Sequence, residues 1–157
     1  MTATLSSTRR LIPALKPLYA RLAPFGYPLI RATAGALLVP HGAQKLFGWF
    51  GGHGLAGTGQ FFADQLGLEP GILFALLVGL AEFAGGLLLA FGLLTRPAAA
   101  VVLALMAYAA FAVHWGNGFF WTEGGLEFPL MWGLLALAIL IRGGGRFSID
   151  AVLGREF

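Results

Sequence analysis

The chain has 157 residues, of which 58% are hydrophobic and 11% are charged, and it carries a formal net charge of +3. Because an average soluble domain has about 25% charged residues, this composition excludes an ordinary soluble enzyme and indicates one small integral membrane domain. The absence of cysteine excludes disulfides, thiolate catalysis and cysteine-ligated iron–sulfur clusters, and the basic residues flank apolar segments without forming the stripe that a nucleic-acid partner requires.

Residues 1–27 are basic and form the first predicted element. Their leucines recur at helical spacing, but Pro13, Pro17 and Pro24 interrupt the pattern. We therefore expect an interfacial segment that lies on the membrane surface. The first transmembrane span is predicted for residues 28–47, and a glycine-rich loop with a short amphipathic piece follows it.

Residues 71–94 form the second predicted span, and its only ionisable residue is Glu82, near the centre. A helix of about 20 apolar residues crosses the roughly 30 Å of bilayer hydrocarbon. A carboxyl group at that depth is costly, so it normally faces a protein interior or a polar cavity. Gly79 and Gly86 share the helix face of Glu82, and small residues mark helix–helix contacts in membranes. Glu82 is therefore predicted to point into the bundle.

Two further spans are predicted for residues 97–115 and 127–141, and the last of these is short for a full crossing. Residues 143–157 form a glycine-rich polar tail. The predicted fold is therefore all-α, with a four-helix transmembrane bundle over residues 28–142.

Lysine and arginine are distributed unevenly between the two sides of the predicted bundle. One side carries nine of the ten: Arg9, Arg10, Lys16, Arg21, Arg31, Arg96, Arg142, Arg146 and Arg155. The other side carries Lys45 together with acidic residues. Because cytoplasmic flanks are enriched in lysine and arginine, both termini and the tail are predicted to be cytoplasmic. An aromatic belt is then predicted at the outer interface, formed by Phe47, Trp49, Phe50, Trp115, Phe119, Phe120 and Trp121.

Several short motifs follow one another in order along the chain. They are HGAQKLFG at 41–48, EFAGG at 82–86, GLLTR at 92–96, GFF at 118–120, GGLEF at 124–128 and GGGRFSID at 143–150. This pattern resembles the DoxX family of small four-helix bacterial integral membrane proteins, over about residues 31–150. The resemblance implies a location in the bacterial cytoplasmic (inner) membrane and an association with redox physiology. Such relatives include the membrane subunit of a thiosulfate:quinone oxidoreductase and a partner in a mycobacterial oxidative-stress complex.

Four polar residues of the first two spans are the main candidates for chemistry. His41, Gln44 and Lys45 lie at i, i+3 and i+4, so they share one helix face. Glu82 and His41 are predicted to be the catalytic pair, in contact directly or through water. Gln44 and Lys45 are predicted to bind a ligand. The alternatives are that Gln44 and Lys45 anchor the span at the interface and that Glu82 is a neutral acid bonded to another helix.

His114 and Glu127 complete the predicted ligand-binding set, at the outer ends of the third and fourth spans. Glu127 has an alternative role, because an anion is favourable at a helix N-terminus. Ionisable residues from four spans in the outer half of the bundle indicate a polar interior site. A quinone or similar amphiphile is the leading ligand. A metal, and then a haem held by His41 and His114, are weaker alternatives, so no metal ligand is assigned and the cofactor stays open.

The predicted function is a membrane component of a redox or oxidative-stress system, with a quinone-like molecule bound inside the bundle. As an enzyme it would be a component of a quinone-linked oxidoreductase. The alternative is a non-catalytic accessory or assembly subunit, whose polar interior only specifies packing. The expected partners are the lipid bilayer and either a second copy of the chain or a larger membrane redox complex.

Overall fold

The computed structural model describes residues 12–155, which form helices and turns without any strand. Its α-helices are α1 (Lys16–Phe47), α2 (Gly54–Leu66), α3 (Gly71–Phe91), α4 (Thr95–Tyr108), α5 (Glu127–Arg142) and α6 (Ile149–Val152). A π-helical segment, Ala109–Val113, extends α4. Short 3-10 turns lie at Pro13–Leu15, Trp49–Gly51, Trp115–Asn117 and Trp121–Glu123. The all-α prediction is confirmed.

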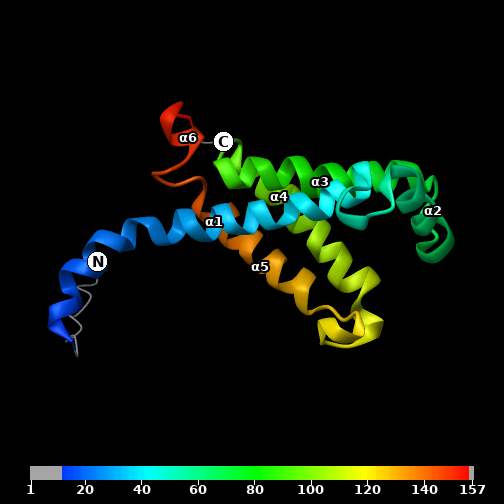
Figure 1. Ribbon diagram of the computed structural model, residues 1–157, viewed down its shortest axis with the longest axis horizontal. Helices are drawn as coiled ribbons and strands as arrows, with labels where there is room; N and C mark the ends of the chain where they lie inside the picture. The colour runs from blue at the N-terminus through cyan, green and yellow to red at the C-terminus, as the bar shows by residue number, and fades with distance from the viewer. Residues whose placement is uncertain (1–11, 156–157) are drawn as a thin grey trace, which may run out of the picture.

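The four long helices correspond to the four predicted spans (Figure 1). Within the described residues, three helices are long and apolar enough to cross a membrane: Pro13–Phe47, Gly71–Phe91 and Thr95–Val113. The fourth, α5, has only 16 residues, as expected from the short apolar run in the sequence. A helix of this length rises about 24 Å, so α5 reaches across most, but not all, of the hydrocarbon layer.

Helix α1 begins at Lys16, well before the expected start of the first span at Pro28. Pro17 occupies the first turn, where its missing N–H has no helical partner to lose. Pro24 and Pro28 lie inside the helix, and each removes one intrahelical hydrogen bond without ending the helix. The placement of residues 16–27 on the membrane surface stays a prediction, and residues 1–11 lie outside the described part of the chain.

Glycines bring α1 and α3 into close contact. A Cβ atom built on Gly35 or Gly42 of α1 would lie less than 3.0 Å from backbone atoms of α3, and one on Gly86 would lie 2.7 Å from the carbonyl oxygen of Gly35. Such distances leave no room for any side chain. The two backbones therefore touch directly, as in membrane helix pairs that use small residues.

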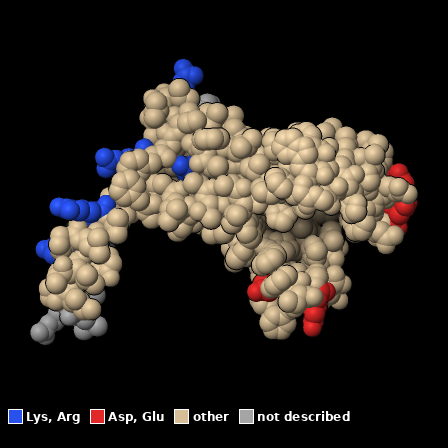
Figure 2. Space-filling view, viewed as in Figure 1, with Lys and Arg blue, Asp and Glu red and all other residues tan. Residues whose placement is uncertain are grey.

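The apolar core lies toward one end of the bundle. Its buried members come from the middle of α1, the end of α3, the length of α4 and the second half of α5: Ala34, Leu38, Leu89, Ala98, Ala99, Val102, Met106, Ala136 and Ile139. At the other end, the last turns of α4 and the start of α5 diverge from α1 and α3 (Figure 1). Figure 2 shows a hollow between that diverging arm and the body formed by α1, α2 and α3. The bundle is thus closed at one end and splayed at the other.

The tail folds back onto the closed end and is fixed there by buried polar groups. The Asp150 carboxylate accepts hydrogen bonds from the backbone N–H of Leu94 (2.8 Å), the backbone N–H of Thr95 (2.9 Å) and the Thr95 hydroxyl (2.6 Å). Arg31 of α1 donates to the carbonyl oxygens of Leu89, of Ala90 (3.1 Å) and of Phe147 (2.7 Å). These contacts tie the tail to the α3–α4 turn and to α1.

Charge is segregated along the molecule. Lysine and arginine gather at the end that carries the N-terminus and the tail, and aspartate and glutamate gather at the opposite end (Figure 2). The seven residues of the predicted aromatic belt are each more than half exposed. They lie at the end of α1 and in the α4–α5 loop, on the acidic side of the molecule.

Candidate functional site

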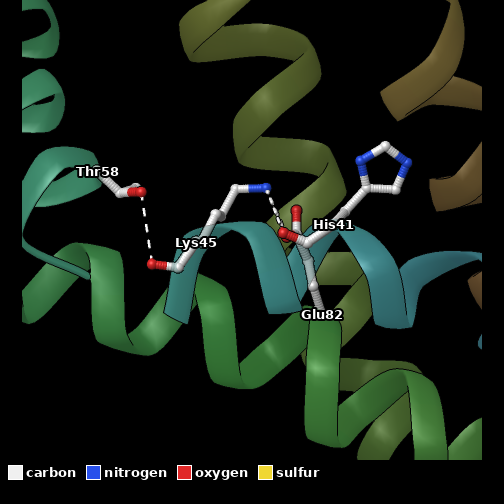
Figure 3. A network of polar contacts seen from close by, with 4 residues as sticks. All are labelled: His41, Lys45, Thr58 and Glu82. Atoms are coloured by element: carbon white, nitrogen blue, oxygen red, sulfur yellow. Dashed lines mark hydrogen bonds and ion pairs between the residues drawn. The ribbon is translucent and has the colours of Figure 1, made fainter. Parts of the chain in front are cut away.

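An ion pair joins α1 and α3 inside the bundle. The Nζ atom of Lys45 lies 2.6 Å from Oε2 of Glu82. The Glu82 side chain is only 10% exposed and that of Lys45 is 25% exposed. Figure 3 shows the two side chains reaching toward each other from their separate helices. The prediction that Glu82 points into the bundle is confirmed.

The position of the pair follows from the packing around it. Gly79 and Gly86 lie one turn to either side of Glu82, on the face that contacts α1, and Gly42 of α1 lies against the α3 backbone at the same level. Because the backbones approach so closely, the carboxylate of Glu82 comes within reach of the Lys45 ammonium group. The buried carboxylate therefore has a neighbouring positive charge, which offsets part of its desolvation cost.

Lys45 has a second contact, and α2 supports the same turn. The Lys45 Nζ atom also lies 3.4 Å from the carbonyl oxygen of His41, so the ammonium group can donate both to this carbonyl and to the Glu82 carboxylate. Thr58 of α2 is buried and donates a hydrogen bond of 3.5 Å to the carbonyl oxygen of Lys45 (Figure 3). This carbonyl lies in the last turn of α1, where it has no intrahelical partner. Helix α2 thus fixes the backbone that presents the lysine.

His41 lies one turn before Lys45, but its imidazole is directed away from the Glu82 carboxylate (Figure 3). His41 is exposed, whereas Glu82 is buried. The structure therefore pairs Glu82 with Lys45, and a direct hydrogen bond between Glu82 and His41, which the sequence left open, is not formed in the described residues. The imidazole is free to meet a ligand or solvent at the surface of the bundle.

Gln44 shapes the loop that follows α1. Its Nε2 atom donates to the carbonyl oxygen of Phe50 at 3.3 Å. Phe50 has a positive φ of 54°, a conformation that is uncommon for an aromatic residue. The Gln44 side chain therefore helps to hold this turn, and its proposed contact with a ligand stays a prediction.

His114 and Glu127 organise the α4–α5 loop at the splayed end. The Nδ1 atom of His114 lies 2.6 Å from the carbonyl oxygen of Gly124, which can only accept, so this nitrogen is the donor. Glu127 accepts a hydrogen bond of 3.1 Å from the backbone N–H of Trp121. Neither residue forms a hydrogen bond or an ion pair with Lys45 or Glu82 within residues 12–155. Of the six predicted site residues, Lys45 and Glu82 form a central pair and His41 lies one turn away, whereas Gln44, His114 and Glu127 bond to the backbone of loops.

No group of three or more histidine, aspartate or glutamate side chains that could hold a metal ion occurs within residues 12–155. A paired ammonium and carboxylate can donate to a carbonyl oxygen and accept or release a proton.

Arg31 and Asp150 are buried ionisable residues that were not among the predicted site residues. Both are only 2% exposed. Two signals pointed toward them: an arginine inside an apolar segment, and the motifs at 92–96 and 143–150, which meet in space through Asp150 and Thr95. Their contacts are with backbone carbonyls, backbone amides and a hydroxyl, so they build the closed end of the fold.

The family model of DoxX matches residues 26–115. An uncharacterized protein of Haemophilus influenzae is 31% identical over 134 residues, which cover 81% of this chain and 90% of that protein. The Escherichia coli protein described as "Inner membrane protein YqjF" is 35% identical over 114 residues, which cover 70% of this chain and 82% of that protein. No solved structure gives a significant match.

Proposed function

Because this chain belongs to the DoxX family and is a multi-pass membrane protein, we propose that it acts as the membrane component of a redox or oxidative-stress system. In this proposal it binds a quinone-like small molecule beside the Lys45–Glu82 pair. The relative from Escherichia coli is described as an inner membrane protein, and we assign the same membrane to this chain.

The observation that carries the proposal is the ion pair itself. Glu82 is the only ionisable residue of α3, and a carboxyl group within a span usually marks a ligand or proton path. Its partner Lys45 keeps a quarter of its side chain exposed, so the pair is reachable from outside the bundle. We infer that the ligand enters from the splayed end, where a hollow separates the body from the diverging arm (Figure 2).

Each side chain has a distinct part in the proposed chemistry. The Lys45 ammonium donates to a carbonyl oxygen of the bound ring, and Glu82 accepts or returns the proton that accompanies reduction or oxidation of that ring. His41 is exposed, one helical turn before Lys45, and exchanges protons with Glu82 through water, since it forms no direct hydrogen bond with the carboxylate. Reduction of a quinone to a quinol takes two electrons and two protons. A redox protein that binds this chain supplies the two electrons, and Glu82 delivers the two protons in turn, taking up a proton from the surface between the transfers.

A second candidate function rests on the same contacts. Lys45 and Glu82 satisfy each other at 2.6 Å, and glycine contacts fix α1 against α3 on both sides of them. A pair of this kind can specify the register of two helices without any catalysis. The chain would then be an accessory or assembly subunit of a larger membrane complex.

Mass spectrometry of small molecules retained by the protein in mild detergent separates the two functions. The first function predicts a co-purified quinone that is retained by the native chain and lost from Glu82→Gln, which keeps the shape but removes the titratable group. Glu69→Gln, a change at an exposed carboxylate outside the spans, is the matched control and should retain the quinone. A stable Glu82→Gln protein that keeps its partner complex and its full cellular activity would support the accessory function instead.

A further inference from the structure

A second site lies at the closed end of the bundle, far along the chain from the Lys45–Glu82 pair. It is a pocket of about 370 Å³ between the end of α5 and the folded tail. Arg142, Arg146 and Arg155 line it, together with the glycines of the loop that joins α5 to the tail. Three arginines around one hollow give it a strongly positive character.

The described residues leave this pocket with an excess of positive charge. None of the three arginines forms an ion pair with a carboxylate in residues 12–155. Asp150 is the only acidic residue in the lining, so its single carboxylate, which also accepts hydrogen bonds from Leu94 and Thr95, offsets only one of the three positive charges. The pocket therefore suits an anion.

Aromatic rings position two of the guanidinium groups. Arg142 lies over the ring of Tyr27 at 4.6 Å from the centroid, and Arg146 lies over the ring of Phe147 at 5.2 Å. A guanidinium stacked on a ring keeps its N–H donors in the plane free for an anion. Arginine in this setting favours phosphate, which it can bind through two parallel hydrogen bonds.

The pocket is built into the fold. Gly143 and Gly145 have φ values of 77° and 71°, which glycine adopts without strain. Ser148 donates to the carbonyl oxygen of Gly145 at 2.6 Å, and Asp150 fixes the tail to the α3–α4 turn. The arginines are thus held on a loop whose shape is set by buried contacts.

Two residues that line the basic pocket are next in sequence to a residue that lines an apolar groove. The groove also has a volume of about 370 Å³, and it is lined by Ala84, Leu87, Leu88, Phe91, Leu93 and Ile149. Most of these residues belong to the last two turns of α3, a helix long and apolar enough to span the membrane. Ile149 lines the groove, while its neighbours Ser148 and Asp150 line the basic pocket.

We propose that the basic pocket and the apolar groove together bind one anionic phospholipid. The head-group phosphate lies among the arginines, and an acyl chain lies along the groove on α3. The two halves of the site match the two halves of such a lipid. The pocket also lies where α5 ends and the tail begins, which is the depth of the head groups when the bundle spans a bilayer, and basic pockets between helices at this depth bind anionic lipid heads.

The test uses the full chain in nanodiscs of equal parts phosphatidylglycerol and phosphatidylcholine. Native mass spectrometry then counts the lipids that stay bound after release into mild detergent. The native chain should retain phosphatidylglycerol in preference to phosphatidylcholine. The double change Arg146→Gln and Arg155→Gln should weaken the binding of phosphatidylglycerol about thirtyfold, as expected for the loss of two basic contacts near a membrane surface.

Matched variants distinguish a defined site from diffuse charge. Lys16→Gln with Arg21→Gln removes the same charge from exposed positions outside the pocket and should leave lipid retention unchanged; an equal loss there would overturn the proposal. Arg146→Lys with Arg155→Lys keeps the charge but loses the paired donors, so it should restore part of the binding lost in the glutamine variants, which a folding defect could not do. Ile149→Gln should weaken the retention of phosphatidylglycerol, because it places a polar side chain in the apolar groove.

A competition experiment separates a lipid site from a phosphate site. Displacement of the lipid by excess inorganic phosphate would identify a free-phosphate site and would also overturn the proposal.

Discussion

At the scale of single residues, Glu82 depends on Lys45. The carboxylate is almost buried, and the only ion pair among residues 12–155 neutralises it. Removing one partner of a buried pair leaves an uncompensated charge, which costs more than removing both partners together. The energy of the pair is therefore best measured as a coupling between the two residues.

A double-mutant cycle measures that coupling. We expect Lys45→Met alone to lower the free energy of unfolding by about 1–3 kcal/mol, less than for a fully buried pair because Lys45 keeps a quarter of its surface exposed. Lys45→Met combined with Glu82→Gln should cost less than the sum of the single changes, by about 1–2 kcal/mol. Unfolding in mixed detergent micelles provides the measurement, and strict additivity would show that the pair contributes no coupling.

Protonation of Asp150 should determine how the attachment of the tail to the bundle weakens as the pH falls. Burial acts to raise its pKa, but hydrogen bonds from Thr95 and Leu94 and the charge of Arg31 together hold the pKa below its ordinary value. A carboxyl group with a lowered pKa in the folded state contributes stability above its unfolded pKa, near 3.9, and loses that contribution as the pH falls through the folded pKa. The ionised carboxylate thus stabilises the closed end at neutral pH.

Replacement of this carboxylate should remove both the stability and its pH dependence. We expect Asp150→Asn to lower the free energy of unfolding at pH 7 by about 2–3 kcal/mol, because the amide cannot accept all three hydrogen bonds. The loss of stability between pH 5 and pH 2 should be smaller in the variant than in the native chain. Thermal unfolding across this range provides the measurement. Asp64→Asn, at an exposed position, should keep the native pH profile.

At the scale of elements, the contact between α1 and α3 sets the geometry of the site. Gly35 and Gly42 let the two backbones touch, and this contact brings Lys45 to Glu82. Helix α2 also meets the start of α3 through glycines, since a Cβ atom on Gly71 would lie 2.0 Å from the carbonyl oxygen of Gly59. Helix α5 instead contacts α1 through a side chain: Trp132 donates to the carbonyl oxygen of Ala34 at 3.3 Å. The ion pair therefore depends on the glycine contact between α1 and α3.

Two glycines of α1 provide a matched test of this feature. A Cβ atom at Gly35 would lie less than 3.0 Å from the α3 backbone, whereas one at Gly26 would meet nothing within 4 Å. We expect Gly35→Ala to destabilise the bundle by about 1–3 kcal/mol through overpacking. Gly26→Ala should be neutral or stabilise the helix by up to about 1 kcal/mol. Equal effects of the two changes on unfolding in detergent would contradict the close helix contact.

At the scale of the whole molecule, the bundle has two unlike ends. One end is closed by the apolar core and by the tail. The other end is splayed, with the diverging arm and the hollow of Figure 2. Basic residues mark the closed end and acidic residues the splayed end. Because lysine and arginine favour the cytoplasmic side, we expect the closed end in the cytoplasm and the proposed quinone site to open outward.

Reporter fusions test this orientation directly. A fusion after Phe157 and one in the turn at Thr95 and Arg96 should both be active as cytoplasmic reporters. A fusion near Gly57, in α2 at the opposite end, should be active only as an exoplasmic reporter. The reverse pattern would place the hollow and the Lys45–Glu82 pair on the cytoplasmic side and would contradict the charge argument.

The sequence by itself determined the fold class, the membrane environment and the burial of Glu82. These follow from local properties, namely the length of apolar runs and the spacing of glycines around one carboxyl group. The start of α1 at Lys16 was not predicted, because a membrane helix tolerates internal prolines that would end most soluble helices.

Only the tertiary structure decided which polar residues meet. Lys45, and not His41, reaches Glu82, because the rotation and separation of α1 and α3 depend on which glycines interlock. Likewise Asp150 meets Thr95 across 55 positions of sequence, and three arginines converge on one pocket. Contacts between segments far apart in the chain depend on packing in three dimensions, for which a local pattern carries no information.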